Sequence, residues 1–231
     1  MKLIGLIGGL SWESTTEYYR ILNQGAQARL GGVHSARSLI YSFDFGEIEA
    51  LQHAGRWDAA EAAMIDAAQR LERGGAGFLV ICSNTMHRMA GAIEAAVKPP
   101  LLHIADPTGA AIKAAGFKRI GLLGTGFTME QPFYRQRLID KFGLDVLVPD
   151  AAGRKVVHDI IYTELVKGIV RDESRAAYRK VIARLIEDGA EGIILGCTEI
   201  MLLVGAADSA VPLFDTTTIH AEAALQRALG Q

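Results

Sequence analysis

Two cysteines are the residues of this chain whose positions best suit chemistry. Cys82 and Cys197 are the only cysteines among 231 residues. Each closes a short apolar run, and each is followed by polar residues, Ser83-Asn84-Thr85 in one case and Thr198-Glu199 in the other. Ligands of parallel α/β sheets bind beyond the carboxyl ends of the strands. The pattern therefore predicts a thiol at a ligand site in each half of the chain.

The number and surroundings of the cysteines limit what they can do. Small secreted chains held by disulfides usually carry more of them, and neither C-x-x-C nor H-E-x-x-H, two common zinc motifs, occurs. The thiols are therefore either buried core groups or reactive ones. Ser, Asn and Thr are N-cap residues, so we expect a helix N-terminus beside each thiol. Its N–H groups would lower the thiol pKa and hold a carboxylate.

The two halves of the sequence resemble each other. Ile4–Gly8 recurs as Ile120–Gly124, 116 residues later, and Gly77–Cys82 matches Gly192–Cys197, 115 residues later. Both segments repeat after nearly the same number of residues, about half the length of the chain. This indicates an internal duplication. The cysteines therefore occupy equivalent places in the two halves.

Short apolar runs separated by helix-patterned segments predict an α/β fold with parallel sheets. The runs lie near residues 2–8, 38–43, 77–82, 101–104, 119–123, 145–148, 192–196 and 211–214. With the duplication, we expect two similar parallel-sheet α/β domains related by a pseudo-twofold, with the active site in the cleft between them. Residues 1–103, with the C-terminal helix at 212–231, would form the first domain, and residues 104–211 the second.

Paired thiols suit inversion of stereochemistry at carbon. A thiolate on one face would remove an α-proton, a thiol on the other face would return one, and the roles would exchange in reverse. Backbone N–H groups aimed at the developing negative charge would stabilise the carbanion. This chemistry would need no pyridoxal lysine.

The motifs resemble those of the aspartate/glutamate racemase family, and within it the aspartate racemase and broad-specificity amino-acid racemase branch. The matching stretches are Ile4–Thr15, Cys82–His87, Gly124-Thr125 and Gly196–Ile200, spread over essentially the whole chain. The resemblance implies catalytic thiols at Cys82 and Cys197, no cofactor, two α/β domains, and usually a homodimer.

The resemblance also implies a set of substrate-binding residues. Those expected to hold the α-carboxylate and α-ammonium are Asn84, Thr85, Thr125 and Thr198, with Ser11 in the glycine-rich turn over the same cleft. Glu199 joins this set, and it stands where glutamate racemases of the wider family usually carry His. That difference speaks against an enzyme dedicated to glutamate.

The sequence leaves open which amino-acid side chain the site prefers in its substrate. Aspartate-specific relatives are expected to hold the second carboxylate with an Arg after the second strand and a Lys from the second half. Here the matching positions are Gln52 and Lys167. A neutral amide holds a carboxylate less tightly than a guanidinium, so aspartate, glutamate, asparagine and neutral amino acids all remain candidates.

The resemblance implies a small-molecule amino acid as the partner, and composition argues against two other classes of partner. The formal net charge is -2 and no basic stripe stands out, so nucleic acid is not expected. No apolar run approaches the ~18 residues of a membrane span, and the apolar N-terminus resembles a first strand more than a signal peptide, which predicts a cytoplasmic protein. The alternatives are a maleate cis-trans isomerase, hydantoin racemase or decarboxylase reaction, or a non-catalytic small-acid binding protein.

Overall fold

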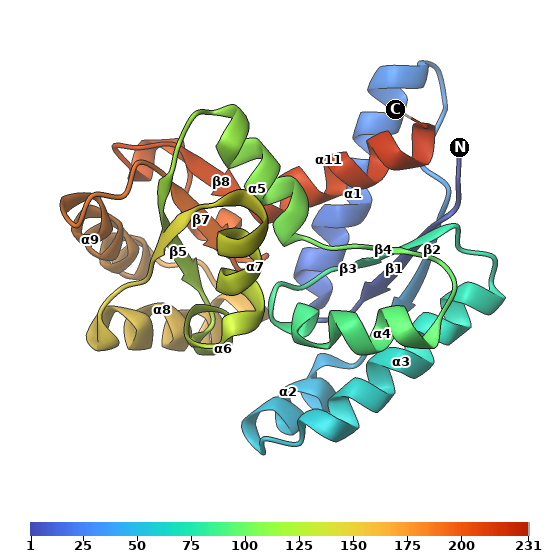
Figure 1. The fold of residues 1–231 in the computed structure, drawn as a ribbon, viewed down its shortest axis with the longest axis horizontal. Helices are drawn as coiled ribbons and strands as arrows, with labels where there is room; N and C mark the ends of the chain where they lie inside the picture. Colours follow the sequence, from blue (N-terminus) through green and yellow to red (C-terminus); the bar gives the residue numbers. More distant parts are fainter. Residues whose placement is uncertain (231) are drawn as a thin grey trace. The chain divides into compact units, whose positions relative to one another are not determined.

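The chain forms two compact units in a computed structural model that describes residues 1–230. The first unit holds Met1–Ile104 together with the residues from His220 onward, and the second holds Ala105–Ile219. Each unit contains one four-stranded parallel sheet flanked by helices (Figure 1).

The sheet of the first unit has the strand order β2-β1-β3-β4, with every neighbouring pair parallel. Its strands are β1 (Ile4–Gly8), β2 (Ser38–Ser42), β3 (Phe78–Ile81) and β4 (Leu101–Leu102). All residues of β1 and β3 are buried. Central strands covered on both faces explain why the sequence shows continuous apolar runs there rather than alternation.

Helices cover both faces of this sheet. Helices α1 (Trp12–Leu30) and α11 (Thr216–Leu229) contribute Tyr18, Leu22 and Leu225 to one apolar cluster with β1 and β3. The opposite cluster is built against α3 (Trp57–Arg73), which contributes Met64 and Leu71. The elements that complete this second face are α2 (Phe45–His53), the 3-10 helix η1 (Thr85–Met89) and α4 (Ala90–Ala96).

The second unit repeats this topology with the order β6-β5-β7-β8. Its strands are β5 (Arg119–Gly124), β6 (Asp145–Leu147), β7 (Ile193–Gly196) and β8 (Leu213–Asp215). Its helices are α5 (Ala105–Ala114), α6 (Gly126–Glu130), α7 (Pro132–Phe142), α8 (Ala151–Thr163), η2 (Leu165–Lys167), α9 (Asp172–Glu187), α10 (Ile200–Leu203) and η3 (Ala206–Asp208). The eight strands lie where the apolar runs predicted them, and the shared strand order confirms two similar parallel-sheet α/β domains.

The two units exchange their last helices. Helix α5 follows β4 of the first sheet but belongs to the second unit, where Asp106 bonds Arg137 of α7 at 2.6 Å. Helix α11 follows β8 of the second sheet, and from His220 onward it belongs to the first unit. There the Lys2 N–H donates to the Ala228 carbonyl oxygen at 2.8 Å. The same exchange in both directions fits the duplication.

One detail of the expected domain boundary differs from the structure. The sequence predicts that residues 212–231 belong to the first domain, whereas β8 pairs in parallel with β7 and completes the second sheet. The second unit therefore extends through Ile219. The return to the first unit occurs inside α11, because a strand must stay with the sheet that satisfies its backbone hydrogen bonds.

Within residues 1–230, no helix combines the length and the apolar character needed to cross a bilayer.

Candidate active site

Cys82 is fixed at the carboxyl end of β3. Its N–H donates to the Ile7 carbonyl oxygen at 2.9 Å, so the β1–β3 ladder extends to the cysteine itself. The Cys82 carbonyl oxygen accepts from Ser14 Oγ at 3.4 Å. The thiol is fully buried, in the apolar cluster that also contains Tyr18. Cys82 therefore lies on the face of the first sheet that α1 and α11 cover.

The turn after Cys82 is held by a histidine. His87 Nδ1 lies 2.7 Å from the Ser83 carbonyl oxygen, and the Ile104 N–H donates to His87 Nε2 at 3.1 Å. A carbonyl can only accept and an amide N–H can only donate, so His87 is the neutral tautomer with its proton on Nδ1. Both ring nitrogens are thus used to hold the turn and the chain at Ile104.

The substrate-binding residues expected from the first half gather at this end of the sheet. Ser11 is the buried N-cap residue of α1, and Asn84 and Thr85 are buried in the turn after Cys82. Gln52, buried in α2, donates from Nε2 to Met86 Sδ at 3.1 Å. That contact holds α2 against the segment that follows Cys82.

Cys197 directly follows β7 and has a carboxylate beside it. Its Sγ donates to Glu199 Oε2 at 2.9 Å, and Thr198 Oγ1 donates to the same oxygen at 3.0 Å. All three residues are buried. The resemblance implies a substrate-binding role for Glu199; in the structure its carboxylate accepts hydrogen bonds from the thiol and from the neighbouring hydroxyl.

Two threonines of α11, which no sequence motif pointed to, hold the segment around Cys197. Thr216 Oγ1 donates to the Leu195 carbonyl oxygen at 2.8 Å, and Thr217 Oγ1 donates to the Thr198 carbonyl oxygen at 3.3 Å. Both threonines follow the last apolar run, and threonine is typical of the residues that begin a helix. The sequence does not indicate which carbonyl groups they contact, because those contacts depend on tertiary packing.

Thr125 lies next to Cys197 at the same sheet edge. Gly124 of β5 pairs with Gly196 of β7. Thr125 and Cys197 are the residues that directly follow this pair. Thr125 caps α6, because its Oγ1 accepts from the Thr128 N–H at 3.2 Å. The Gly126 N–H donates to His158 Nδ1 at 3.0 Å, which fixes the turn against α8.

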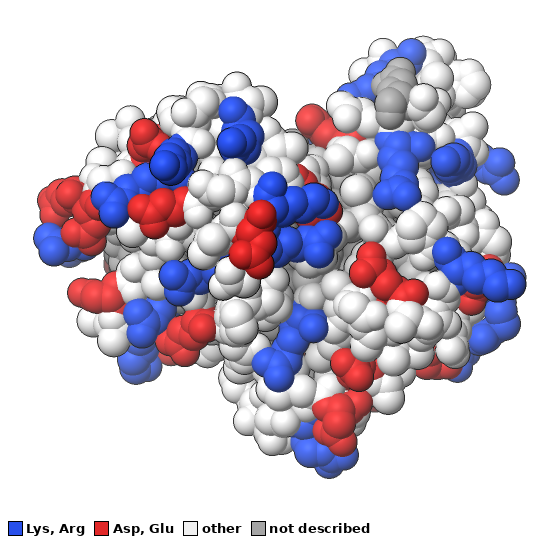
Figure 2. All heavy atoms as spheres, viewed as in Figure 1, with Lys and Arg blue, Asp and Glu red and all other residues white. Residues whose placement is uncertain are grey.

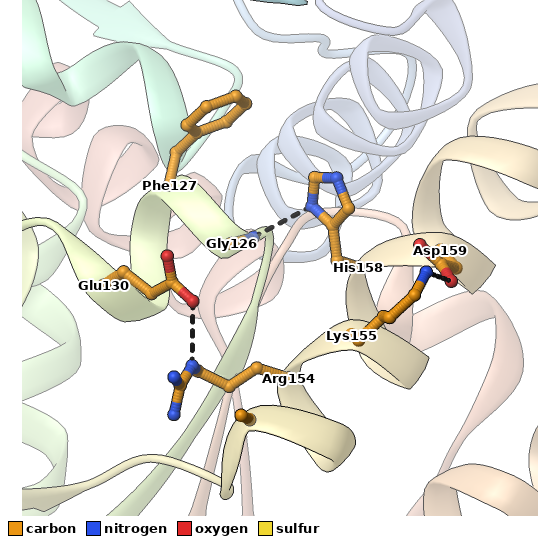
Figure 3. Close-up of a pocket in the computed structure, with 8 residues that line it drawn as sticks. Gly126, Phe127, Glu130, Arg154, Lys155, His158 and Asp159 are labelled. Carbon is orange, nitrogen blue, oxygen red and sulfur yellow. Dashed lines mark hydrogen bonds and ion pairs between the residues drawn. The ribbon is translucent and has the colours of Figure 1, made fainter.

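A pocket of about 380 Å³ opens beside this turn (Figure 3). The labelled residues that line it include two ion pairs, Arg154 with Glu130 at 2.9 Å and Lys155 with Asp159 at 2.6 Å. Lys167, the expected partner for a distal carboxylate, is instead an exposed residue at the end of η2.

The sequence predicts a lowered pKa for both thiols, but in the structure both pKa values are raised. Burial raises the pKa of the Cys82 thiol above its ordinary value. Burial also raises the pKa of Cys197, and the negative charge of Glu199 raises it further. The expected net lowering is wrong: the backbone N–H groups of Thr198 and Glu199 do lower the pKa of Cys197, but burial and the Glu199 charge outweigh them. The segments that follow the cysteines, the 3-10 helix η1 and the single turn α10, are also too short for a strong helix dipole.

These groups supply two neutral thiols, each at the carboxyl end of an equivalent strand. A thiol of raised pKa holds its proton at neutral pH and can act as a general acid. It becomes a base when a nearby group accepts that proton. Glu199 is placed to do this for Cys197, whereas the high pKa of Cys82 arises from burial alone.

Known proteins resemble the chain over nearly its full length. The broad-specificity amino-acid racemase RacX of Bacillus subtilis is 25% identical over 225 residues, 95% of each chain. A crystal structure from Yersinia pestis, provisionally named an Asp/Glu racemase, is 55% identical with a TM-score of 0.91, covering 99% of this chain and 100% of that one. An aspartate racemase homologue from Pyrococcus horikoshii is 32% identical with a TM-score of 0.84 at the same coverage.

The family model for Asp/Glu/hydantoin racemases matches residues 7–224. That range contains both cysteines, the Ser11 turn and the Thr125 turn. The chain therefore belongs to the Asp/Glu/hydantoin racemase family.

Proposed function

We propose that the chain is a cofactor-independent amino-acid racemase that uses Cys82 and Cys197 as its acid and base. The observation that carries the proposal is their equivalence: each cysteine follows the third strand, in chain order, of one of two sheets with the same topology. Inversion at an α-carbon needs one proton donor and one proton acceptor of matched chemistry. A duplicated thiol supplies both.

The surroundings of the two thiols favour different resting roles. Glu199 takes the proton of Cys197, and the resulting thiolate removes the α-proton of the substrate. Cys82 gives its own proton to the opposite face of the carbanion and is left as a thiolate. Exchange with solvent then restores the starting protonation states, and the opposite enantiomer runs the same steps in reverse. The mechanism requires that both thiols reach the same α-carbon.

A bound substrate helps the thiolate form. Its α-ammonium group is a cation, and an opposite charge within ~4–6 Å favours the charged form of a thiol. Desolvation keeps both thiols protonated before binding. The reactive thiolate is therefore expected mainly in the substrate complex.

Substrate selection rests on the residues that face the reacting groups. In this proposal Gln52 faces the side chain of the substrate. The α-carboxylate and α-ammonium of the substrate are bound by Ser11, Asn84, Thr85, Thr125 and Thr198. An amide both donates and accepts, so it suits amide, acidic and neutral side chains. Lys167 adds a cation for acidic substrates. We therefore propose broad specificity that includes aspartate, in keeping with the names of RacX and of the Pyrococcus relative.

The decisive experiment follows α-proton exchange by NMR in deuterated water. Purified protein, stripped of pyridoxal phosphate by hydroxylamine and dialysis, is incubated with L- and D-amino acids led by aspartate, glutamate and asparagine. We expect exchange and accumulation of the opposite enantiomer, both lost after alkylation of the two thiols. Cys82→Ser and Cys197→Ser should each abolish inversion, and one of them should retain exchange with a single enantiomer.

The same experiment separates the alternatives. A maleate isomerase or hydantoin racemase would leave amino acids unexchanged but turn over its own substrate. A binding protein would be stabilised thermally by an amino acid without exchanging its α-proton. Racemisation that persists after both thiols are modified would refute the two-thiol mechanism.

A further inference from the structure

A histidine of α8 holds the turn that carries Thr125. The Gly126 N–H donates to His158 Nδ1 at 3.0 Å, although the two residues are 32 positions apart in the chain. The imidazole points from α8 toward Gly126 at the start of α6 (Figure 3). A side chain of one helix thus satisfies a backbone N–H in the first turn of another, which the second helix cannot satisfy by itself.

This hydrogen bond exists in one protonation state of the histidine. A backbone N–H can only donate, so His158 Nδ1 accepts and the neutral ring carries its proton on Nε2. Protonation of Nδ1 would set one N–H against another and break the bond to Gly126. Histidine is the side chain whose charge ordinarily changes between ~pH 5 and pH 8. The turn is therefore tied down by a group that titrates near neutral pH.

Two aromatic rings fix the orientation of the imidazole. The ring of Tyr162, buried in α8, lies 4.8 Å from that of His158 between centroids, with the planes tilted by 48°. Phe127, the residue after Gly126, meets the imidazole nearly perpendicularly at 6.1 Å. Because of these contacts, Nδ1 stays directed at the Gly126 N–H.

The other charged groups around the ring are occupied with one another. Those that line the pocket beside it form two ion pairs, Arg154 with Glu130 and Lys155 with Asp159. From the side of η2 and α9, Glu164 accepts from Ser174. Burial raises the pKa of Tyr178, which keeps its hydroxyl neutral. The ion pairs add no net charge, so the imidazole itself decides the charge beside the turn.

We propose that His158 is a positioning residue, which holds the Thr125 turn in place for the substrate only while its imidazole is neutral. The inference rests on the proposed role of Thr125 in binding the backbone groups of the substrate. Thr125 directly precedes Gly126, so release of that N–H displaces a hydroxyl that the substrate needs. The thiols follow other strands, β3 and β7, and the effect therefore falls on substrate affinity rather than on proton transfer.

Two variants separate the hydrogen bond from the bulk of the side chain. In His158→Asn, an amide oxygen near the place of Nδ1 still accepts but does not titrate, whereas His158→Leu has no acceptor. At pH 8 we expect the Asn variant to keep the native KM. The Leu variant should raise KM about 3- to 10-fold, the value of one hydrogen bond, with kcat changed less than about twofold.

The pH profile distinguishes positioning from a merely structural role. As the pH falls from 8 to 5.5, the ratio of the native KM to that of His158→Asn should rise toward the ratio of His158→Leu to His158→Asn. The ratio between the two variants should stay constant. His34→Leu, at an exposed position of the first unit, is the control and should follow the native protein at every pH.

The Gly126 amide reports the hydrogen bond without any turnover. In protein labelled with ¹⁵N-glycine, its NMR signal is identified by its loss in Gly126→Ala. Between pH 8 and pH 5.5 this signal should move in the native chain toward its position in His158→Leu, and it should stay constant in His158→Asn.

The two readouts separate this inference from the proposed function. A Gly126 signal unmoved by pH and by His158→Leu would overturn the inference, and so would equal KM values for the Leu and Asn variants. A signal that moves as expected, in a protein that exchanges no amino-acid α-proton, would refute the proposed racemase while upholding the hold of His158 on the turn.

Discussion

Glu199 makes the two catalytic candidates chemically unequal. The Cys197 thiol donates to its carboxylate at 2.9 Å, and Thr198 donates to the same oxygen. Cys82 lies instead in an apolar cluster with Tyr18 and Leu22. The two strand ends thus carry the same residue, but Cys197 is hydrogen-bonded to a carboxylate. In the proposed mechanism the two thiols therefore have different resting roles.

Glu199→Gln tests that assignment. The amide can still accept a hydrogen bond from Cys197 but cannot take up its proton. We expect kcat to fall about 10²- to 10⁴-fold, the usual contribution of general base catalysis, with little change in KM. The control is Glu164→Gln, which removes a carboxylate that accepts from Ser174 at 2.6 Å. An equal loss of kcat in both variants would attribute the effect to folding rather than to proton transfer.

The buried thiol of Cys82 predicts a pH dependence of stability. Its pKa is raised in the folded state, so the folded protein keeps a proton that the unfolded chain loses above its ordinary pKa of ~8.5. This contribution is therefore complete below that pH and is lost as the pH rises. The free energy of unfolding should fall by about 1.4 kcal/mol per pH unit from this group.

Urea unfolding between pH 7 and pH 10.5 measures this effect. Cys82→Ala should show a shallower alkaline decline than the native chain. Val80→Ala, at a fully buried position of the same strand, should lose stability at every pH while keeping the native slope. Parallel curves for the native chain and Cys82→Ala would contradict the protonated, buried thiol.

At the scale of elements, the turn after β1 depends on a glycine. Gly9 has a φ of 71° and leads from the strand to Ser11 at the start of α1. A Cβ at this position would lie 2.3 Å from the backbone N and O of Phe43, which cannot move away without shifting the segment after β2. The turn that carries Ser11 can therefore pass close to Phe43 only with glycine.

Gly9→Ala should destabilise the protein by at least about 2 kcal/mol, because backbone strain and a steric clash add. Gly143→Ala provides the comparison. Gly143 has a φ of 65° at the C-terminus of α7, but a Cβ there meets no atom within 4 Å. It should cost about 1–2 kcal/mol, the backbone penalty alone. Chemical denaturation of both variants checks the difference, and equal losses would disprove the close approach at Phe43.

At the scale of the whole molecule, each unit contains a helix that follows the last strand of the other unit. Helix α5 follows β4, and α11 follows β8. The first core depends on Leu225 and its α11 neighbours, although the chain reaches them only after completing the second unit. The first unit therefore cannot fill its core from one continuous segment, whereas the second unit is the continuous segment Ala105–Ile219. On the face drawn in Figure 2, basic and acidic side chains are interspersed over the surface.

Leu225→Ala should loosen the first unit selectively. Truncation of a fully buried leucine costs about 2–5 kcal/mol, and Leu225 is buried against α1 and the first sheet. Hydrogen exchange should accelerate in β1 and β3 while β5 and β7 keep native protection. Leu30→Ala, at an exposed position of α1, should change neither pair. Equal acceleration in both sheets would show that the units open together.

The sequence by itself determined the strands, the duplication and the places of the two thiols. Strands such as Phe78–Ile81 are readable because burial on both faces demands an unbroken apolar run. The position of Cys82 and Cys197 at strand ends follows from that pattern and from the polar residues after them.

Tertiary structure alone decided the environment of those thiols and the course of the chain between units. The bond from Cys197 to Glu199, the holding of the Ser83 turn by His87 and the raised thiol pKa values depend on which side chains meet and on how completely water is excluded. The place where α11 leaves the second unit depends on β8 completing a sheet. Sequence periodicity records whether a residue is buried, but the groups that surround it come from segments distant in the chain, and only their packing brings them together.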